Sequence, residues 1–501
     1  MTYAHTYSGT RTREPSPREL EHGRLARRAA AGGIVLLKNT GTLPLDLSAP
    51  VALFGSGASR TVKGGIGSGD VNNRANVSIC QGLKDAGLRL TSENWLEDYE
   101  ARYHAARAAW KQKVLEAARW VENPFDAYAA NPFVLPQGRP IVPQDVQGAA
   151  AAIYVLSRIA GEGKDRRLEK GDYYLSDGEW NDLRTLDRLG LPIVLLINAG
   201  GPVELTDLLD GAVHIEAVLQ LSQLGQEGGH AVADVLLGKA TPEGKLTATW
   251  ARRYTDYPCA ESFSYLDGDL EKAVYREGIY VGYRYFDSFG VQPLFPFGYG
   301  LSYTDFSLRF AGLRVGADAI EVDVEVENAG ICFSGREVAQ VYISCPQNGG
   351  AKELRRLAGF AKTRLLAPEQ CQTLTICIPQ KQLATFAAQK QGWVVEQGLY
   401  GVWVGNSSAA VTLCAQIRVE ADTLIEQTHP ICPLSQPLDE LGAADAAQKE
   451  AAHPAGLPVY GFCPRPEPRP ECPPAPRAAG PVAALLPLLC GHITKGPRPR
   501  G

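Results

Sequence analysis

The sequence predicts an α/β domain with a mostly parallel sheet flanked by helices, followed by an all-β sandwich domain. The first prediction rests on apolar runs, glycine-containing loops and helical patterns that alternate along the first half of the chain. The second rests on a change at about Ile320, after which apolar and polar residues alternate. With 501 residues and an apolar fraction of 45%, the chain is long enough for more than one core.

Composition excludes several classes of protein. The net charge of -5 gives no basic surface for nucleic acid. No uninterrupted apolar run of about 18 residues is present to span a membrane, and the polar N-terminus lacks the apolar core of a signal peptide. Eleven cysteines at scattered spacings, without a C-x-x-C pair, indicate reduced thiols rather than a disulfide framework or a zinc site. We therefore expect a cytoplasmic protein without metal, cofactor, nucleic-acid partner or membrane partner. Its oligomeric state is open.

The elements of the first domain follow from these patterns in order. Helices are predicted at residues 17–33, 77–86, 95–118, 176–189 and 230–237. Strands are predicted at residues 33–39, 51–55, 150–156, 191–201 and 214–220. Leu20, Leu25 and Ala29 are expected to supply the buried side of the first helix. The proline-containing residues 123–144 are interpreted as a surface excursion.

The second half divides into three further segments. Short strands are predicted at residues 320–328, 337–344, 372–378, 398–405 and 410–419, as in an antiparallel sandwich. The predicted division of the chain is an α/β domain at 1–253, an aromatic-rich connection at 254–310, a sandwich at 311–425, and a linker with a Pro/Arg-rich, disordered tail at 426–501. The aromatic connection forms an interdomain core or stacks against sugar rings.

Residues 150–175 place one carboxylate directly after an apolar run. Glu162 lies between Gly161 and Gly163, so the backbone can turn there and hold the carboxylate at the carboxyl edge of the sheet. Open α/β sheets bind their ligands at that edge. The alternative interpretation is a solvated surface turn with an ion pair between Asp165 and Arg166.

A glycine-rich loop at residues 55–74 is a second candidate site. Its glycine spacing matches neither the P-loop nor the dinucleotide-binding pattern, so nucleotide binding is a distant alternative. The loop is better suited to line a site for a polyhydroxylated ligand, with Lys63, Ser68 and Asp70 as hydrogen-bonding groups. His230 is interpreted as a first-turn helix residue, with contact to a ligand as the alternative. Glu227 is interpreted as a ligand group or as a favourable charge at a helix N-terminus.

Five ordered motifs resemble a known family. They are GGIVLLKNTGTLPL, KGGIGSGDVN, SRIAGEGKDR with KGDYYLSD, GQEGGHAVADVLLGKATPEGKLTATW and PLFPFGYGLSYTDF. The chain resembles the family 3 glycoside hydrolases of the β-glucosidase type, over about residues 20 to 425. The resemblance implies an α/β sandwich domain, a fibronectin type III-like domain, and retaining hydrolysis of terminal β-linked sugars.

The resemblance also assigns roles to residues of this chain. Glu162 is similar in position to the general acid/base of the family. Arg158, Asp165 and Arg166 lie in the same loop and are expected to shape it and to contact the carbohydrate substrate, together with Lys63, Ser68 and Asp70. A retaining mechanism needs a second carboxylate about 5 Å away, which the family places on a (β/α)₈ barrel.

The sequence contains no recognisable barrel. The domain order resembles a permuted subgroup in which the barrel follows the fibronectin-like domain, but the residues after about Leu441 are Pro- and Arg-rich and too few for one. We therefore expect a truncated member of the family, and a natural Pro-rich linker is the alternative. Two functions stay open: a β-glucosidase-like enzyme whose nucleophile lies elsewhere, and a non-catalytic carbohydrate-binding or scaffold fragment.

Overall fold

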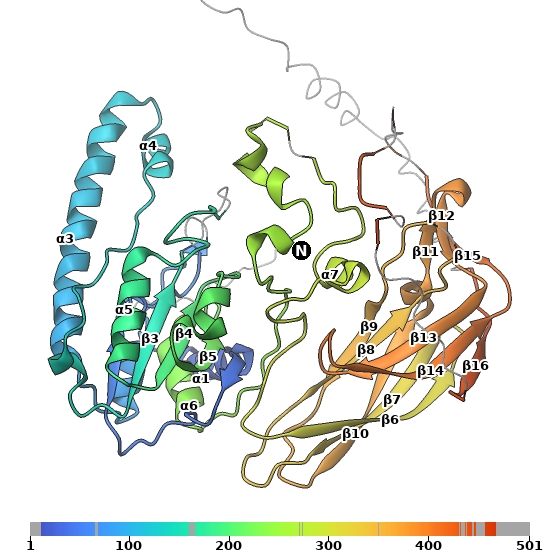
Figure 1. Cartoon of the computed structure of the whole chain (residues 1–501), viewed down its shortest axis with the longest axis horizontal. Coiled ribbons are helices and arrows are strands. Elements are labelled where there is room, and N and C mark those ends of the chain that lie inside the picture. Colours follow the sequence, from blue (N-terminus) through green and yellow to red (C-terminus); the bar gives the residue numbers. More distant parts are fainter. Residues whose placement is uncertain are drawn as a thin grey trace, which may run out of the picture.

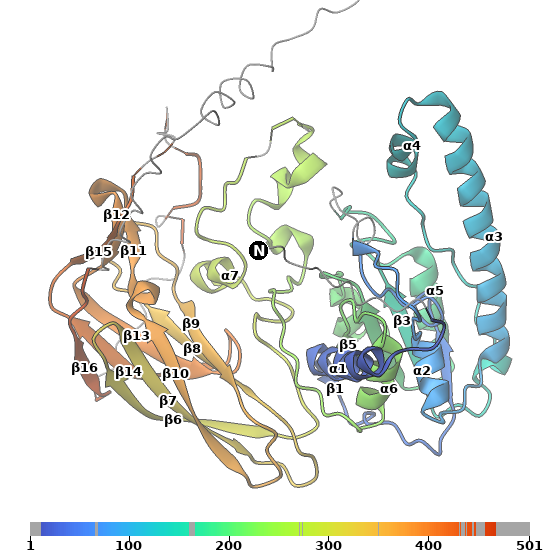
Figure 2. The same cartoon turned by 180° about the vertical axis from the view of Figure 1, so that it is seen from behind.

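The computed structural model describes residues 12–65, 69–159, 166–269, 271–272, 274–348, 350–429, 431, 436, 438–442, 445–446 and 456–466. An α/β domain and a β sandwich lie at opposite ends of the molecule, and the segment that connects them lies between the two (Figures 1 and 2). Among the described residues, no helix combines the length and apolar character needed to cross a bilayer.

The α/β domain contains a mixed, mostly parallel sheet. Its strands are β1 (Val35–Asn39), β2 (Val51–Phe54), β3 (Ala151–Ser157), β4 (Ile193–Asn198) and β5 (Ile215–Gln220). They lie in the order β1-β5-β4-β3-β2, with β2 to β5 parallel and β1 antiparallel to β5. Every residue of β3 and β4 is buried, as expected for strands covered on both faces. The predicted fold class is confirmed.

Helices cover both faces of this sheet. The helices of the domain are α1 (Pro17–Gly33), α2 (Ile79–Asp85), α3 (Glu93–Ala117), α4 (Pro124–Ala130), α5 (Asp177–Arg188) and α6 (Gly228–Leu236). Helices α1, α2 and α6 lie together on one face (Figure 2), and α3 and α5 lie on the other (Figure 1). Helices α2 and α6 meet at glycines, because a Cβ on Gly82 would lie 2.1 Å from the carbonyl oxygen of Gly229. Only glycine permits this approach.

Helix α1 has the predicted bounds but a different buried side. The prediction of its core residues was wrong, because all three are exposed: Leu20, Leu25 and Ala29. The buried residues are Ala30 and Ala31, in the last turn. Arg27 adds a bidentate ion pair to Asp234 of α6, with Nε 2.5 Å from Oδ2. Small side chains and an ion pair thus attach α1 to α6, and the leucines of α1 stay exposed.

The predicted surface excursion contains a helix that the sequence analysis missed. Helix α4 begins after Asn123, whose Oδ1 accepts a hydrogen bond from the backbone N–H of Phe125 at 3.1 Å. Pro124 occupies the first helical position, where it needs no hydrogen-bond donor. The helix packs against the outer end of α3, the long helix at the far side of the α/β domain from the sandwich (Figure 1).

The second domain is a β sandwich, as predicted. Its strands are β6 (Phe306–Val315), β7 (Ala319–Asn328), β8 (Val338–Ser344), β9 (Arg356–Lys362), β10 (Cys371–Pro379), β11 (Thr385–Ala387), β12 (Gly392–Val395), β13 (Gly398–Gly405), β14 (Val411–Val419), β15 (Thr423–Gln427) and β16 (Val459–Phe462). The sheets β10-β7-β6 and β16-β14-β13-β8-β9 enclose the core, and β11-β12-β15 forms a smaller sheet. In β10 the buried residues Leu374, Ile376 and Ile378 alternate with exposed ones, which is the alternation that predicted the domain.

Two strands differ from the sequence-based division. Strand β6 begins before the predicted boundary between residues 310 and 311 and continues through it. Strand β16 lies within residues 426–501, predicted as linker and tail, and pairs in parallel with β14. Four residues between prolines are too short to show a period in sequence, and the pairing comes from a neighbouring strand far away in the chain.

The connecting segment packs into the sandwich through α7 (Tyr283–Phe289). The Tyr283 hydroxyl accepts a hydrogen bond from the backbone N–H of Leu357 at 2.8 Å, and Ser288 Oγ accepts one from the backbone N–H of Leu354 at 2.9 Å. The Tyr283 ring also stacks on Phe297, with 4.8 Å between ring centroids. This part of the aromatic segment therefore packs against the sandwich.

Candidate functional site

The carboxyl edge of the parallel strands carries the candidate site. Asn198 at the end of β4 is fully buried and binds the neighbouring loops. Its Oδ1 accepts from the backbone N–H of Val62 at 2.6 Å, and its Nδ2 donates to the carbonyls of Val62 at 2.9 Å and Ser222 at 2.8 Å. One side chain at the end of β4 thus joins the loops that follow β2 and β5. The sequence analysis did not single it out.

Arg158, directly after β3, is buried with 6% of its surface exposed. Its guanidinium makes a bidentate ion pair with Glu179 of α5, at 2.6 and 2.8 Å. Its other N–H groups donate to backbone carbonyl oxygens of Ser157 at 2.9 Å, Asp172 at 2.6 Å and Tyr174 at 3.3 Å. All five donors of the guanidinium have protein partners, so Arg158 shapes the loop and has no donor to offer a ligand.

Arg166, at the other end of the loop, binds the same backbone carbonyl of Asp172 as Arg158 does. Its Nη2 donates to the carbonyl oxygen of Asp172 at 2.8 Å, the atom that also accepts from Arg158. The Asp172 carboxylate accepts from Arg166 Nε at 2.5 Å and from the backbone N–H of Arg167 at 2.6 Å. Asp172 therefore fixes the residues on both sides of the segment 160–165.

That segment contains the principal predicted residue. Glu162 and Asp165 lie outside the described residues, and so does Ser68 of the glycine-rich loop. Their roles stay predictions. The described residues fix where the segment leaves β3, at Arg158, and where it returns, at Arg166.

Two of the three ligand-binding residues predicted in the glycine-rich loop, Lys63 and Asp70, are described and lie together. Lys63 Nζ is 3.2 Å from Asp70 Oδ1, and it also donates to the backbone carbonyl of Val71. The Lys63 carbonyl oxygen accepts from the backbone N–H of Gly225 at 2.9 Å, which joins this loop to the loop after β5. Among the described residues, no hydrogen bond or ion pair connects Lys63 or Asp70 to the arginines around Asp172.

His230 has a structural role, as its first interpretation predicted. Its Nδ1 is 2.8 Å from Glu227 Oε2 and its Nε2 is 2.9 Å from Asp85 Oδ2. These carboxylates raise the pKa of His230 against the opposing effect of partial burial. The ring thus links the N-terminus of α6 to the C-terminal end of α2, and Glu227 is the N-cap of α6.

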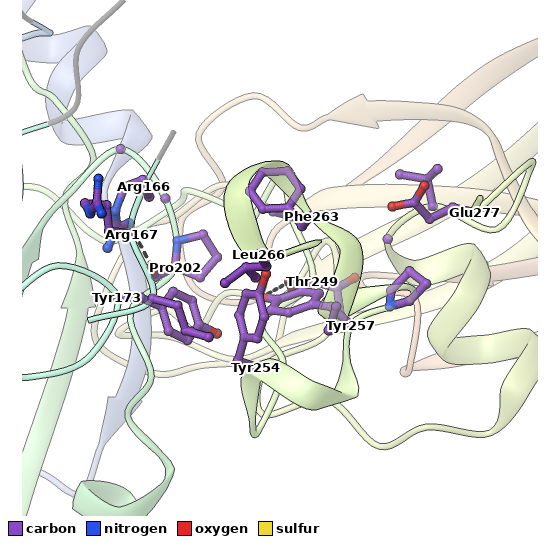
Figure 3. A pocket seen from close by; sticks show the side chains of 18 of the residues that line it. Arg166, Arg167, Tyr173, Pro202, Thr249, Tyr254, Tyr257, Phe263, Leu266 and Glu277 are labelled. Atoms are coloured by element: carbon purple, nitrogen blue, oxygen red, sulfur yellow. Dashed lines mark hydrogen bonds between the residues drawn. The ribbon is translucent and has the colours of Figure 1, made fainter. Parts of the chain in front are cut away.

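A cavity of about 880 Å³ lies between this edge and the connecting segment (Figure 3). Arg166 and Arg167 line one end, Glu277 lines the other, and Gly65 places the glycine-rich loop at its border. Gly200 and Pro202, after β4, line its wall. Its aromatic lining residues are Tyr173, Tyr254, Tyr257, Phe263 and Tyr265. The volume lies within the range of small-molecule sites, which is about 300–1,000 Å³.

The tyrosines of the cavity contact one another and the α/β domain. The Tyr254 ring meets Tyr173 edge to face, with 5.4 Å between centroids. The Tyr257 hydroxyl donates to the carbonyl of Thr249 at 3.3 Å, and burial raises its pKa. Tyr265 accepts from the backbone N–H of Leu168 at 2.8 Å, so the connecting segment is attached just beyond residues 160–165.

The described residues contain no group of His, Cys, Asp or Glu side chains suited to hold a metal ion. The cysteines found free in the described part of the chain are Cys80, Cys259, Cys332, Cys345, Cys371, Cys377, Cys414 and Cys463.

Asp172 and the cavity tyrosines were not singled out from sequence. Asp172 and Tyr173 stand in the quoted motif KGDYYLSD. Its aspartate gave a usable signal in the sequence, because an acidic residue near two arginines at a strand end favours ion pairing. The aromatic connection was noted as a possible sugar-stacking segment. Its position against the sheet edge is a tertiary contact and has no local sequence signal.

Comparison with protein families agrees with this architecture. Residues 34–303 match the model of the glycosyl hydrolase family 3 C-terminal domain. Residues 337–408 match the model of a fibronectin type III-like domain. The first match covers more than half of the chain and includes the sheet edge, the cavity and the segment with Glu162.

Individual relatives are longer than this chain. A β-glucosidase from Ruminococcus albus is 34% identical over 423 residues, which are 81% of this chain and 42% of that protein. The solved structure of β-glucosidase 3B from Thermotoga neapolitana with α-D-glucose is 36% identical, with a TM-score of 0.69, covering 82% of this chain and 56% of that one. A β-glucosidase structure from Paenibacillus barengoltzii is 33% identical, with a TM-score of 0.73, covering 83% and 45%. The chain thus spans about half the length of these relatives, and its matched domains show that it belongs to glycosyl hydrolase family 3.

Proposed function

We propose that this chain provides the general acid/base of a β-glucosidase-type hydrolysis, with Glu162 in that role. The supporting observation is that Arg158 and Arg166, which flank the segment 160–165, both bind Asp172 at the carboxyl edge of the sheet, and that Arg166 also lines the cavity. A proton donor contributes to catalysis only if its position is fixed relative to the scissile bond. The proposed substrate is a terminal β-linked sugar, cleaved with retention through two carboxylates.

The nucleophile is proposed to lie on a barrel that the described residues do not contain. Among the residues lining the cavity, Glu277 is the described carboxylate. It lies at the opposite end from Arg166 (Figure 3), away from the attachment of residues 160–165. A barrel on another polypeptide or on a longer form of the protein would bring the second carboxylate to the exposed side of this edge.

The test is hydrolysis of p-nitrophenyl β-glycosides by the purified chain, beside Glu162→Gln and Glu277→Gln. If the chain turns over substrate, Glu162→Gln should lower kcat by about 10²–10⁴-fold, the usual contribution of general acid/base catalysis. The loss should be smaller for dinitrophenyl glycosides, whose leaving group needs little protonation. Unchanged kcat in Glu162→Gln would refute the role of this residue.

Glu277→Gln tests whether the nucleophile is Glu277 or a carboxylate elsewhere in the chain. Activity that survives this change but not Glu162→Gln points to a carboxylate elsewhere in the chain. Activity lost in both makes Glu277 the second carboxylate.

A non-catalytic carbohydrate-binding role is the second candidate. It is favoured by the aromatic lining of the cavity, since aromatic rings stack against the apolar faces of sugars. When turnover is absent, saturation-transfer NMR with glucose decides between the catalytic role and the binding role. Glucose binding without hydrolysis supports the binding role, and the absence of both leaves the catalytic proposal dependent on a barrel added in trans.

A cytoplasmic location is also proposed. It is supported by free thiols, several of them exposed, which persist in a reducing compartment. Fractionation of cells that express the protein tests it, and recovery of the protein from the medium with oxidised cysteines would contradict it.

A further inference from the structure

Strand β16 is the outermost strand of the larger sandwich sheet, on the side far from the α/β domain (Figure 1). Its four residues pair in parallel with residues 416–419 of β14, and the backbone N–H of Gln416 donates to the carbonyl of Pro458 at 2.9 Å. Without β16, this side of β14 would have no partner among the described strands. A free strand edge is a template for pairing with another extended chain.

The side chains of residues 456–466 show what the sandwich recognises in this segment. Tyr460 is half-buried, and Phe462 is only 4% exposed within the core of the sandwich. Pro464 is buried as well, so every second residue faces inward. Gly461 faces outward, because a Cβ built on it would meet no atom within 4 Å. The contacts therefore select the residues at positions 460, 462 and 464 and accept any side chain at 461.

Gln380 binds the backbone of the same segment. Its side chain is 4% exposed, donates from Nε2 to the carbonyl of Arg465 at 2.8 Å and accepts at Oε1 from the backbone N–H of Arg465 at 3.0 Å. The Arg465 residue itself is exposed. Because both hydrogen bonds go to the main chain, Gln380 holds an extended segment whatever side chain stands at this position. The acceptor site thus consists of the β14 edge, the space that Phe462 fills and Gln380.

The connection from this segment to the rest of the sandwich is long. Strand β15 ends at Gln427 and β16 begins at Val459. Even from Leu441, whose backbone N–H donates to the carbonyl of Arg276 at 2.8 Å, about 17 residues remain, and an extended chain spans about 3.3–3.6 Å for each residue. This length allows the acceptor site to be filled by a segment of the same chain or of a neighbouring molecule.

We propose that the acceptor site is a peptide-binding site that residues 456–466 fill in cis, and that it takes the same segment of a second copy of this chain when its own strand leaves. The ligand is an extended chain with aromatic residues at two alternate positions and a proline two residues further on. Four paired residues and one fully buried ring are few contacts, so the strand belongs to the parts of the fold that open most easily. Exchange of identical segments is a low-cost route to dimers.

The first test is a fluorescence-anisotropy titration of a labelled peptide of residues 456–466, with Cys463 replaced by Ser, against full-length chains. Phe462→Ala weakens the chain's own strand, so we expect saturable binding to this variant, at least tenfold tighter than to the wild type, whose site is filled. Tyr460→Pro opens the site in a second way and leaves Phe462 in place, because proline removes a backbone N–H from the paired strand. Absence of saturable binding at millimolar peptide to a variant with wild-type circular dichroism would overturn the proposal. Equal binding to the wild type would place the peptide elsewhere.

Gln380→Ala locates the peptide at the acceptor site. Added to Phe462→Ala, it removes both hydrogen bonds to the peptide backbone, and we expect about tenfold weaker binding, equivalent to about 1.4 kcal/mol. Gln397→Ala is the matched control, because Gln397 is exposed and no described hydrogen bond joins its side chain to residues 456–466. Equal peptide affinities after Gln380→Ala and Gln397→Ala would contradict the assigned site.

Sedimentation velocity tests exchange with a second copy. The Phe462→Ala chain has an open acceptor site and a defective strand, whereas the Gln380→Ala chain has an intact strand and a weakened acceptor site. We expect a larger species in the mixture of the two chains that neither forms alone, and we expect excess peptide to dissociate it. A mixture that sediments as the sum of its components would overturn the exchange between copies.

Discussion

Replacing Arg158 by Met is expected to lower the free energy of unfolding by about 3–5 kcal/mol, the usual cost of leaving one partner of a buried ion pair alone. Glu179 would keep a charge with 13% of its side chain exposed and would lose both guanidinium hydrogen bonds. The carbonyls of Ser157 and Asp172 would each lose a donor. Urea unfolding followed by circular dichroism measures the change.

Two controls define the cause of this loss. Arg102→Met removes an ion pair to Asp98 on the exposed surface of α3, and it should cost less than about 1 kcal/mol. Adding Glu179→Gln to Arg158→Met should restore part of the stability, because no buried charge then remains unpaired. A midpoint for Arg158→Met equal to that of Arg102→Met would show that the buried pair does not hold the loop.

The second large effect is expected at Asp182 of α5, as a change in the pH dependence of stability. The side chain is 5% exposed, and burial raises its pKa to about 7. Tyr154 donates a hydrogen bond to its Oδ2 at 3.1 Å, which opposes this shift, and the nearby Glu179 charge adds to the rise in pKa. The folded state therefore retains a proton that the unfolded chain releases near the ordinary pKa of 3.8.

The sign of the pH effect follows from this difference. Because the folded pKa is the higher one, this contribution to stability is complete below about pH 4 and is lost as the pH rises to about 7. Asn cannot ionise, so Asp182→Asn should match the wild type near pH 4 and exceed it at pH 8. At about 1.4 kcal/mol for each pKa unit, the gain at pH 8 is at most about 4 kcal/mol.

Urea unfolding at pH 4.5, 6 and 8 measures this effect. Asp305→Asn is the control, since Asp305 is exposed and its change should alter stability by less than about 0.5 kcal/mol at each pH. Parallel stability profiles for the wild type and Asp182→Asn would mean that Asp182 is ionised in the folded protein. Another group would then stabilise its negative charge.

The local features of the chain were readable from sequence because neighbouring residues determine them. The start of α5 is an example, where Ser176 and Glu179 form a reciprocal cap: Glu179 N–H donates to Ser176 Oγ at 3.2 Å, and Ser176 N–H donates to Glu179 Oε2 at 2.7 Å. The buried runs of β3 and β4 and the alternation of β10 are equally local. Together they determined the fold class, the two main domains and the strand end from which the segment of Glu162 leaves.

Only the tertiary structure decided which residues meet across long stretches of chain. The leucines of α1 were expected on its buried side, but small residues and Arg27 make the contact to α6. Asp172 joins Arg158 and Arg166, and the cavity forms where the connecting segment crosses the sheet edge. Such contacts depend on the positions of elements that are distant in sequence, and the spacing of residues along one element contains no information about its partner.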